Sequence, residues 1–429
     1  MRNNLFLFFL LSLQSTFAQQ KTNDMLQKIL SQNTNPALQK VLKEKDSFRL
    51  QIIYTQINRD ENNVPSFKNY YFGTGSDVYF YPASTVKLPL SLLTLEKLNS
   101  LKIKGVNKYT ALEFDSSHPW QIPVSTDSSS ENNLPSLAHY IKKAFLISDN
   151  DAYNRMYQFV GQKEIHQRLW AKGYDNIRLP KQFMGLSLEN NRFTNSVNFR
   201  DKMGNIIYSQ PGAYNADSFS FGKKINVGIG YLNSKDSLIN KPMDFSTSNN
   251  IPLEDLQQIL QGVMFPSSVP SNKRFKLTAD DHKFLYRYLS QYPSETDFPK
   301  YDTSHYYDSY VKFYFKDSSG KIPPFIRVFN KVGWAYGFMS DVSYVVDFKN
   351  KVEFMLTAAI YVNKDGILND DKYDYESVGL PFMYELGQTI YRYELQRKRK
   401  SSPDLKAFKM EYKKQDKDYK KHAIQHADN

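Results

Sequence analysis

The sequence predicts an α/β fold in which an antiparallel sheet is flanked by N- and C-terminal helices and joined to a helical lobe. Strand-like segments occur near both ends of the chain, at residues 48–57 and at about 325–362. Apolar residues at positions 88–95 open a long helical segment between them. A further apolar pattern predicts a terminal helix over residues 382–400 that packs on the sheet. A cleft is therefore expected between the sheet and the helical lobe.

The segment Ser84-Thr85-Val86-Lys87 stands at the predicted start of the first long helix, just after Pro82. A lysine three residues after a serine lies one helical turn away on the same face, where it can take the hydroxyl proton and activate the serine. A serine at a helix start with a solvated lysine is the simpler alternative for this motif alone. The same spacing recurs without a helical context at Ser220/Lys223, Ser309/Lys312 and Ser318/Lys321.

Two further motifs follow along the chain. Ser148-Asp149-Asn150 ends an apolar segment, and it fits either a polar site or a helix cap. Lys331-Val332-Gly333 follows the strand-like residues 325–329. A surface lysine before a glycine bulge is the alternative explanation for that motif.

Together and in this order, the three motifs resemble those of the penicillin-recognising serine hydrolases, most closely class A β-lactamases. The resemblance covers roughly residues 46–392. It implies that Ser84 is acylated, that Lys87 is its base, and that Ser148 relays a proton to the leaving nitrogen. The substrate-binding residues that it implies are Asn150 for the side-chain amide, Lys331 for the carboxylate, and Gly333, Trp334 and Ala335 on the same strand. The backbone amides of Ser84 and of Trp334 or Ala335 would form the oxyanion hole.

Two departures from the family pattern bear on turnover. Val332 has no hydroxyl where the family usually carries threonine or serine. The expected position of the deacylating glutamate falls on or near Phe183, and the nearest acid is Glu189. Glu189 is the candidate deacylation base, with a solvated loop carboxylate as the alternative. Without such an acid the protein would trap β-lactams rather than destroy them.

The stretch between the second and third motifs is longer than in compact class A enzymes, so we expect an insertion at about residues 195–325. Within it, residues 252–264 predict a helix, and Thr278 predicts the cap of another. Tyrosine and phenylalanine are dense at residues 301–315. These aromatic residues fit either a binding rim or an aromatic-rich core.

Residues 1–18 combine an early arginine, an apolar run and a terminal Ala18, which predicts a cleaved signal peptide. We therefore expect a periplasmic or extracellular protein, and the apolar run is too short for a membrane-spanning helix. The chain has no cysteine, so disulfides, thiol catalysis and lipid attachment at cysteine are excluded. Residues 19–400 are predicted to form one serine hydrolase domain.

The net charge is +12, and residues 401–429 are predicted to be a basic, flexible tail. Such a tail either keeps the protein soluble or adheres weakly to anionic envelope polymers. No His-Glu-x-x-His motif occurs, and the one histidine pair at helical spacing, His422 and His426, lies in the charged tail, which could hardly build a closed metal site. No glycine-rich phosphate loop follows a strand. We therefore expect a monomer without metal, cofactor or nucleic-acid partner, whose ligand is a small β-lactam or a cell-wall peptide.

Three functions remain open at this point. The first is hydrolysis of a β-lactam or similar amide through an acyl-enzyme. The second is a D-alanyl-D-alanine peptidase or another hydrolase of cell-wall peptides or esters. The third is a penicillin-binding protein that becomes acylated and does not turn over.

Overall fold

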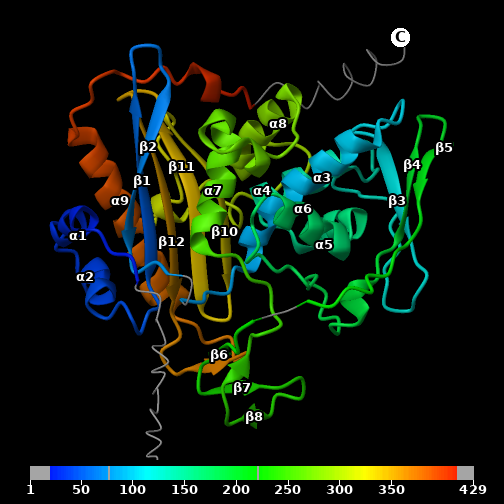
Figure 1. The fold of residues 1–429 in the computed structure, drawn as a ribbon, viewed down its shortest axis with the longest axis horizontal. Coiled ribbons are helices and arrows are strands. Elements are labelled where there is room, and N and C mark those ends of the chain that lie inside the picture. Colours follow the sequence, from blue (N-terminus) through cyan, green and yellow to red (C-terminus); the bar gives the residue numbers. More distant parts are fainter. Residues whose placement is uncertain (1–19, 76–77, 220–221, 413–429) are drawn as a thin grey trace, which may run out of the picture.

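The computed structural model describes residues 20–75, 78–219 and 222–412 (Figure 1). The predicted signal peptide therefore lies outside the described residues. The central sheet has five antiparallel strands in the order β10-β11-β12-β1-β2. This arrangement confirms the predicted fold class. The strands are β1 Gln51–Arg59, β2 Pro65–Phe72, β10 Ile326–Ala335, β11 Phe338–Asp347 and β12 Val352–Tyr361.

The N- and C-terminal helices cover one face of this sheet (Figure 1). They are α1 Asp24–Ser31, α2 Pro36–Lys43 and α9 Leu380–Gln396. The apolar stripe of α9, including Leu386 and Ile390, is fully buried in one cluster with Leu26 of α1 and the strands. Burial of such stripes is the main driving force for docking helices on a sheet. The predicted terminal helix is thus present and ends four residues earlier than expected, because the backbone becomes extended at Arg397.

The helical lobe lies on the opposite side of the sheet (Figure 1). Its helices are α3 Lys87–Leu101, α4 Leu137–Leu146, α5 Asn150–Val160, α6 Gln162–Ala171, α7 Leu253–Met264 and α8 Ala279–Ser290. Helix α3 is buried on nearly every side, because its leucines are spread around the helix rather than along one stripe. Helix α8 begins with the predicted cap, because Thr278 and Asp281 form a reciprocal capping box.

Much of the predicted insertion belongs to the core. Helix α7 packs on β11, β12 and β1, and α8 packs on β10. Three small sheets lie at the periphery, and all of their strands except β3 and β13 come from the predicted insertion (Figure 1). They comprise β3 Ala111–Asp115, β4 Ser196–Arg200 and β5 Ile206–Gln210; β6 Asn226–Val227 and β9 Met243–Asp244; and β7 Gly230–Leu232, β8 Leu238–Ile239 and β13 Ile367–Leu368. Short 3-10 turns lie at Ala83–Val86, Asn190–Arg192, Pro266–Ser268, Ser271–Lys273, Pro293–Glu295, Phe313–Phe315 and Lys406–Phe408, and a π-helical turn spans Tyr375–Gly379.

The aromatic residues near position 310 serve mainly as core. Phe313, Tyr314 and Phe315 are buried against α9, where Gly387 allows Tyr314 to approach the helix backbone closely. Tyr310 is half-buried, with its ring edge-on to Trp334 at 6.1 Å between centroids. The core explanation therefore accounts for the buried part of this segment.

The C-terminal segment up to residue 412 is docked on the protein, in contrast to the flexible tail predicted from residue 401. Leu405 and Phe408 are buried, and the Phe408 ring contacts Phe265, Phe329 and Tyr344. The prediction of a flexible tail rested on the many charged residues of this segment. Docking depends instead on burial of these two apolar side chains. The rest of the predicted tail lies outside the described residues. Across the described ranges, the helices fall short of the length and apolar character that a bilayer crossing needs.

Candidate active site

Ser84 and Lys87 lie at the junction between the 3-10 turn Ala83–Val86 and helix α3. The Lys87 Nζ atom is 2.6 Å from the Ser84 Oγ atom. Ser84 is partly exposed, whereas Lys87 is fully buried. The structure thus places a reachable hydroxyl in direct contact with a desolvated amine.

The turn between α4 and α5 surrounds the same amine. Lys87 Nζ donates to the Ser148 carbonyl at 2.6 Å and to Asn150 Oδ1 at 2.7 Å. Ser148 adopts a φ of 65°, a strained conformation for a residue with a side chain. Asp149 accepts a hydrogen bond from the Ala152 amide at 2.8 Å and caps α5. The helix cap and the polar site therefore coexist, because Asp149 caps while its two neighbours face Lys87.

Burial lowers the pKa of Lys87 to about 7, against an opposing effect from the Asp149 carboxylate. An amine with this pKa is partly neutral near pH 7 and then has a lone pair for the Ser84 proton. The sequence could only propose a buried lysine, and the fold supplies the burial. Such a perturbed group in contact with a nucleophile is characteristic of catalytic sites.

Lys331 approaches from the edge strand β10. Its Nζ atom donates to Ser148 Oγ at 2.8 Å, and the side chain is buried. Burial is the largest cause, and repulsion from Lys87 the second, of a Lys331 pKa that lies well below its usual value. Ser148 Oγ therefore lies between two amines, since Lys87 Nζ is also 3.3 Å away. This geometry suits a hydroxyl that passes protons.

Gly333 lets β10 pass beside the nucleophile. A Cβ atom at this position would lie 2.4 Å from the Pro82 carbonyl oxygen and 2.9 Å from the Ser84 amide nitrogen. Any larger residue would force the strand and the turn apart. The approach brings the Ser84 amide next to the end of β10, where the partly exposed Trp334 and Ala335 follow.

The residues on either side of Gly333 face the other side of the sheet, because side chains alternate along a strand. Val332 is completely buried in the core cluster of that side. The Trp334 ring packs against Phe313 at 5.6 Å between centroids. A hydroxyl at position 332 would therefore point away from Ser84, into the buried layer on the other face of the sheet.

Residues 17–207 match the family model described as the β-lactamase enzyme family. The matched range contains the first two motifs, whose side chains meet at Lys87. This N-terminal part of the chain is therefore similar to the β-lactamase enzyme family. No curated protein matches its sequence.

Several solved structures are similar to this protein in their fold. The β-lactamase from Sphaerobacter thermophilus is 12% identical, with 83% of this chain and 97% of that chain covered and a TM-score of 0.45. The β-lactamase from Streptomyces albus G is 11% identical, covering 83% and 98%, with a TM-score of 0.46. A mutant of PBP-A in its acyl-enzyme complex with penicillin G is 11% identical, covering 84% and 96%, also with a TM-score of 0.46.

The Phe183 side chain lies beside the Lys87 amine. Its ring centre is 5.1 Å from Lys87 Nζ, and the ring stacks on Tyr153 at 4.5 Å. Asn154 fixes the loop, because its Oδ1 atom accepts from the Phe183 amide at 2.8 Å. The sequence showed only that a carboxylate was missing near this position; the contact of the ring with the lysine depends on the fold.

Glu189 lies elsewhere on the surface. Its side chain is 59% exposed, and it pairs with Arg192 at 3.4 Å and accepts from the Tyr214 hydroxyl at 3.0 Å. The structure therefore does not bring Glu189 together with the other candidate residues. Its contacts match the solvated loop carboxylate that the sequence left as the alternative.

A buried polar network behind β10 was not identified from the sequence. Lys312 donates to Asn330 Oδ1 at 2.6 Å, and Asn330 donates to Asp341 at 2.9 Å. Burial lowers the pKa of Lys312 to about 7 and raises that of Asp341 to about 7. This network lies on the sheet face opposite to Lys331. Over the described ranges, the histidine and acidic side chains form no grouping that could hold a metal ion.

Proposed function

We propose that the protein forms an acyl-enzyme at Ser84 with the amide of a β-lactam or of a similar cell-wall peptide. The observation that carries this proposal is the 2.6 Å contact between Ser84 Oγ and Lys87 Nζ, with the pKa of Lys87 lowered to about 7. A neutral amine in contact with a serine hydroxyl is a general base in position. Export through the predicted signal peptide would bring this site to wall-derived substrates.

The acylation step follows from the contacts. Neutral Lys87 takes the Ser84 proton as Ser84 Oγ bonds to the carbonyl carbon, and the Ser84 amide with the β10 backbone receives the developing oxyanion. The carbon–nitrogen bond then breaks. The proton passes from Lys87 through Ser148 to the leaving nitrogen, along contacts of 3.3 Å or less. A substrate carboxylate near Lys331 would favour its charged form.

The second half of a hydrolytic cycle has less support. Phe183 rather than a carboxylate faces Lys87, and Glu189 is paired on the surface. Activation of a water molecule on the acyl bond would then depend on Lys87 itself. We therefore propose that the acyl-enzyme with a β-lactam persists, as in penicillin-binding proteins, and that efficient β-lactam hydrolysis is the less favoured candidate.

Intact-mass spectrometry after addition of benzylpenicillin tests the proposal. We expect an adduct on wild type within minutes that decays over hours, and no adduct on Ser84→Ala. Rapid clearance with accumulation of hydrolysed drug would instead establish a β-lactamase with another deacylation base. An unmodified wild type would refute β-lactam acylation. Release of D-alanine from a D-alanyl-D-alanine peptide, inhibited by penicillin, would identify the peptidase function.

A further inference from the structure

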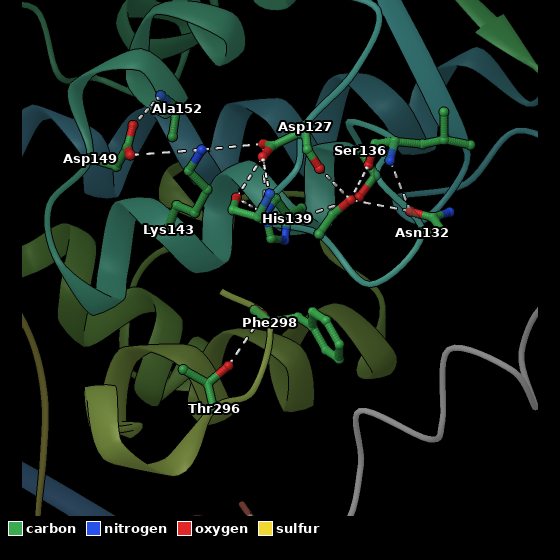
Figure 2. Close-up of polar contacts among 12 residues, drawn as sticks. Asp127, Asn132, Ser136, His139, Lys143, Asp149, Ala152, Thr296 and Phe298 are labelled. Carbon is green, nitrogen blue, oxygen red and sulfur yellow. Dashed lines mark hydrogen bonds and ion pairs between the residues drawn. The ribbon is translucent and has the colours of Figure 1, made fainter. Parts of the chain in front are cut away.

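A chain of charged side chains leads away from the Ser148–Asn150 turn (Figure 2). Lys143 Nζ on α4 is 3.8 Å from Asp149 Oδ2 and 3.2 Å from Asp127 Oδ2. All three side chains are largely shielded, with 20% of Asp149, 13% of Lys143 and 11% of Asp127 exposed. Ion pairs in such surroundings are screened less by water and salt than surface pairs are.

The far end of the chain is held by its own loop. Asp127 accepts hydrogen bonds from the Ser129 amide at 3.0 Å and from the Ser129 hydroxyl at 2.5 Å. His139 Nε2 is 2.9 Å from the Ser129 oxygen, and burial lowers the pKa of His139 to about 4. His139 is therefore neutral at physiological pH, and Lys143 is the cation that contacts Asp127.

Lys143 also contacts the active-site turn through its backbone. Its carbonyl oxygen accepts from the Ile147 amide at 3.3 Å and from the Asp149 amide at 3.4 Å. Lys143 thus lies in the last turn of helix α4, accepts hydrogen bonds from the turn that follows and pairs with the Asp149 carboxylate in that turn. Two independent contacts therefore connect Lys143 to the segment that holds Lys87.

The charged and titratable groups around this chain come from several elements. Asp149, at the start of α5, acts to raise the pKa of Lys87, and Lys87 in turn lowers the pKa of Lys331 on β10. Tyr301 lies near both Asp149 and Asp127, and its pKa is raised by burial and by their charges.

On α4, Lys142 adds a positive charge near His139. On α5, Asp151 pairs with Arg155 at 3.0 Å. Lys143 is the group that contacts both carboxylates of the chain.

We propose that Lys143 is a positioning residue: it anchors the Ser148–Asn150 turn to the loop at Asp127 and neutralises the Asp149 carboxylate beside Lys87. Without this cation, Asp149 attracts a proton to Lys87 more strongly. Loss of the Lys143 charge also removes a repulsion on Lys87, so both effects favour the charged amine. The consequence is a smaller fraction of neutral Lys87 at pH 7. The effect on catalysis rests on the proposed acylation function.

Lys143→Met removes the charge and keeps most of the side-chain length. We expect the Lys87 titration midpoint to rise by about one pH unit, which lowers the neutral fraction at pH 7 about fivefold. Adduct formation with benzylpenicillin should slow about fivefold at pH 7 and recover at pH 9. The rate of adduct formation in Lys143→Arg should remain within about twofold of the wild-type rate, because arginine keeps the charge. The matched control is Lys163→Met, which removes a lysine of α6 that forms an exposed ion pair with Asp217. It should change neither the Lys87 midpoint nor the rate of adduct formation.

The Lys87 midpoint is measured by NMR of lysine labelled with ¹⁵N at Nζ in the full chain, with Lys87→Arg to assign the signal. This readout needs no substrate. If wild type takes up no penicillin, the proposed function fails, while the midpoint shift still tests the role of Lys143.

Two outcomes would overturn the role of Lys143. In one outcome, the Lys87 midpoint in Lys143→Met is unchanged and any loss of acylation rate is the same at all pH values. Such a loss would indicate general damage to the structure rather than a change in the Lys87 titration. The other comes from Asp127→Asn, which also serves if Lys143→Met does not fold. This variant leaves Lys143 to pair with Asp149 alone, so the midpoint should stay or fall, and a rise would contradict the proposal.

Discussion

The Nζ atom of Lys87 lies 5.1 Å from the centre of the Phe183 ring. The ring stacks on Tyr153 and helps to shield the amine from water, and burial is the largest cause of the lowered Lys87 pKa. A carboxylate in the same place would raise that pKa and would be able to activate water. The choice of residue at position 183 therefore bears on both halves of the proposed reaction.

Phe183→Glu should shorten the lifetime of the penicillin adduct by at least about tenfold, because a positioned general base typically contributes about 10²–10⁴ in rate. The lifetime is followed by intact mass after excess drug is removed. Phe183→Gln is the matched control, since it has similar size and no charge. Equal lifetimes in the two variants would show that a carboxylate here cannot reach the acyl bond.

The rate of adduct formation should depend on pH through Lys87. The neutral amine is the reactive form, so the rate should rise about tenfold per pH unit below a pKa of about 7 and level off above it. Stopped-flow or quenched-flow acylation between pH 5 and 9 measures the profile. A rate that is independent of pH over this range would rule out Lys87 as the titrating base.

Gly333→Ala should reduce the acylation rate by about a hundredfold or more. The added Cβ would meet the Pro82 carbonyl and the Ser84 amide, so β10 must move away from the nucleophile. Loss of one oxyanion donor alone typically costs about 10²–10³ in rate. Gly262→Ala in α7 is the control, because its Cβ would meet only Val269 at 3.4 Å. A normal rate in Gly333→Ala would refute the close approach of the strand.

Phe408→Ala should lower the free energy of unfolding by about 3–5 kcal/mol, because it leaves a cavity among Phe265, Phe329 and Tyr344. Acylation of the folded protein should be unchanged. Lys406→Ala, at a side chain that is 90% exposed, should change stability by less than about 0.5 kcal/mol. Denaturant titration distinguishes the two variants. If Phe408→Ala were as stable as Lys406→Ala, the C-terminal segment would not be docked in solution.

The sequence by itself determined the main elements of the fold and identified the motif residues that meet at Lys87. Helix α3, the capping box at Thr278 and the paired strands follow from local periodicity and caps, which neighbouring residues encode. The three motifs located Ser84, Ser148 and Lys331 for the same reason. The order of these short patterns was sufficient to suggest the family.

Only the tertiary structure decided what surrounds Lys87. Burial of its amine, the Phe183 ring beside it and the paired position of Glu189 depend on segments that are distant in sequence, so no local pattern reports them. The docked Phe408 was missed for a similar reason, because its partners come from three separate elements. Desolvation and packing are properties of the assembled fold, and they determine which chemistry the motif residues can perform.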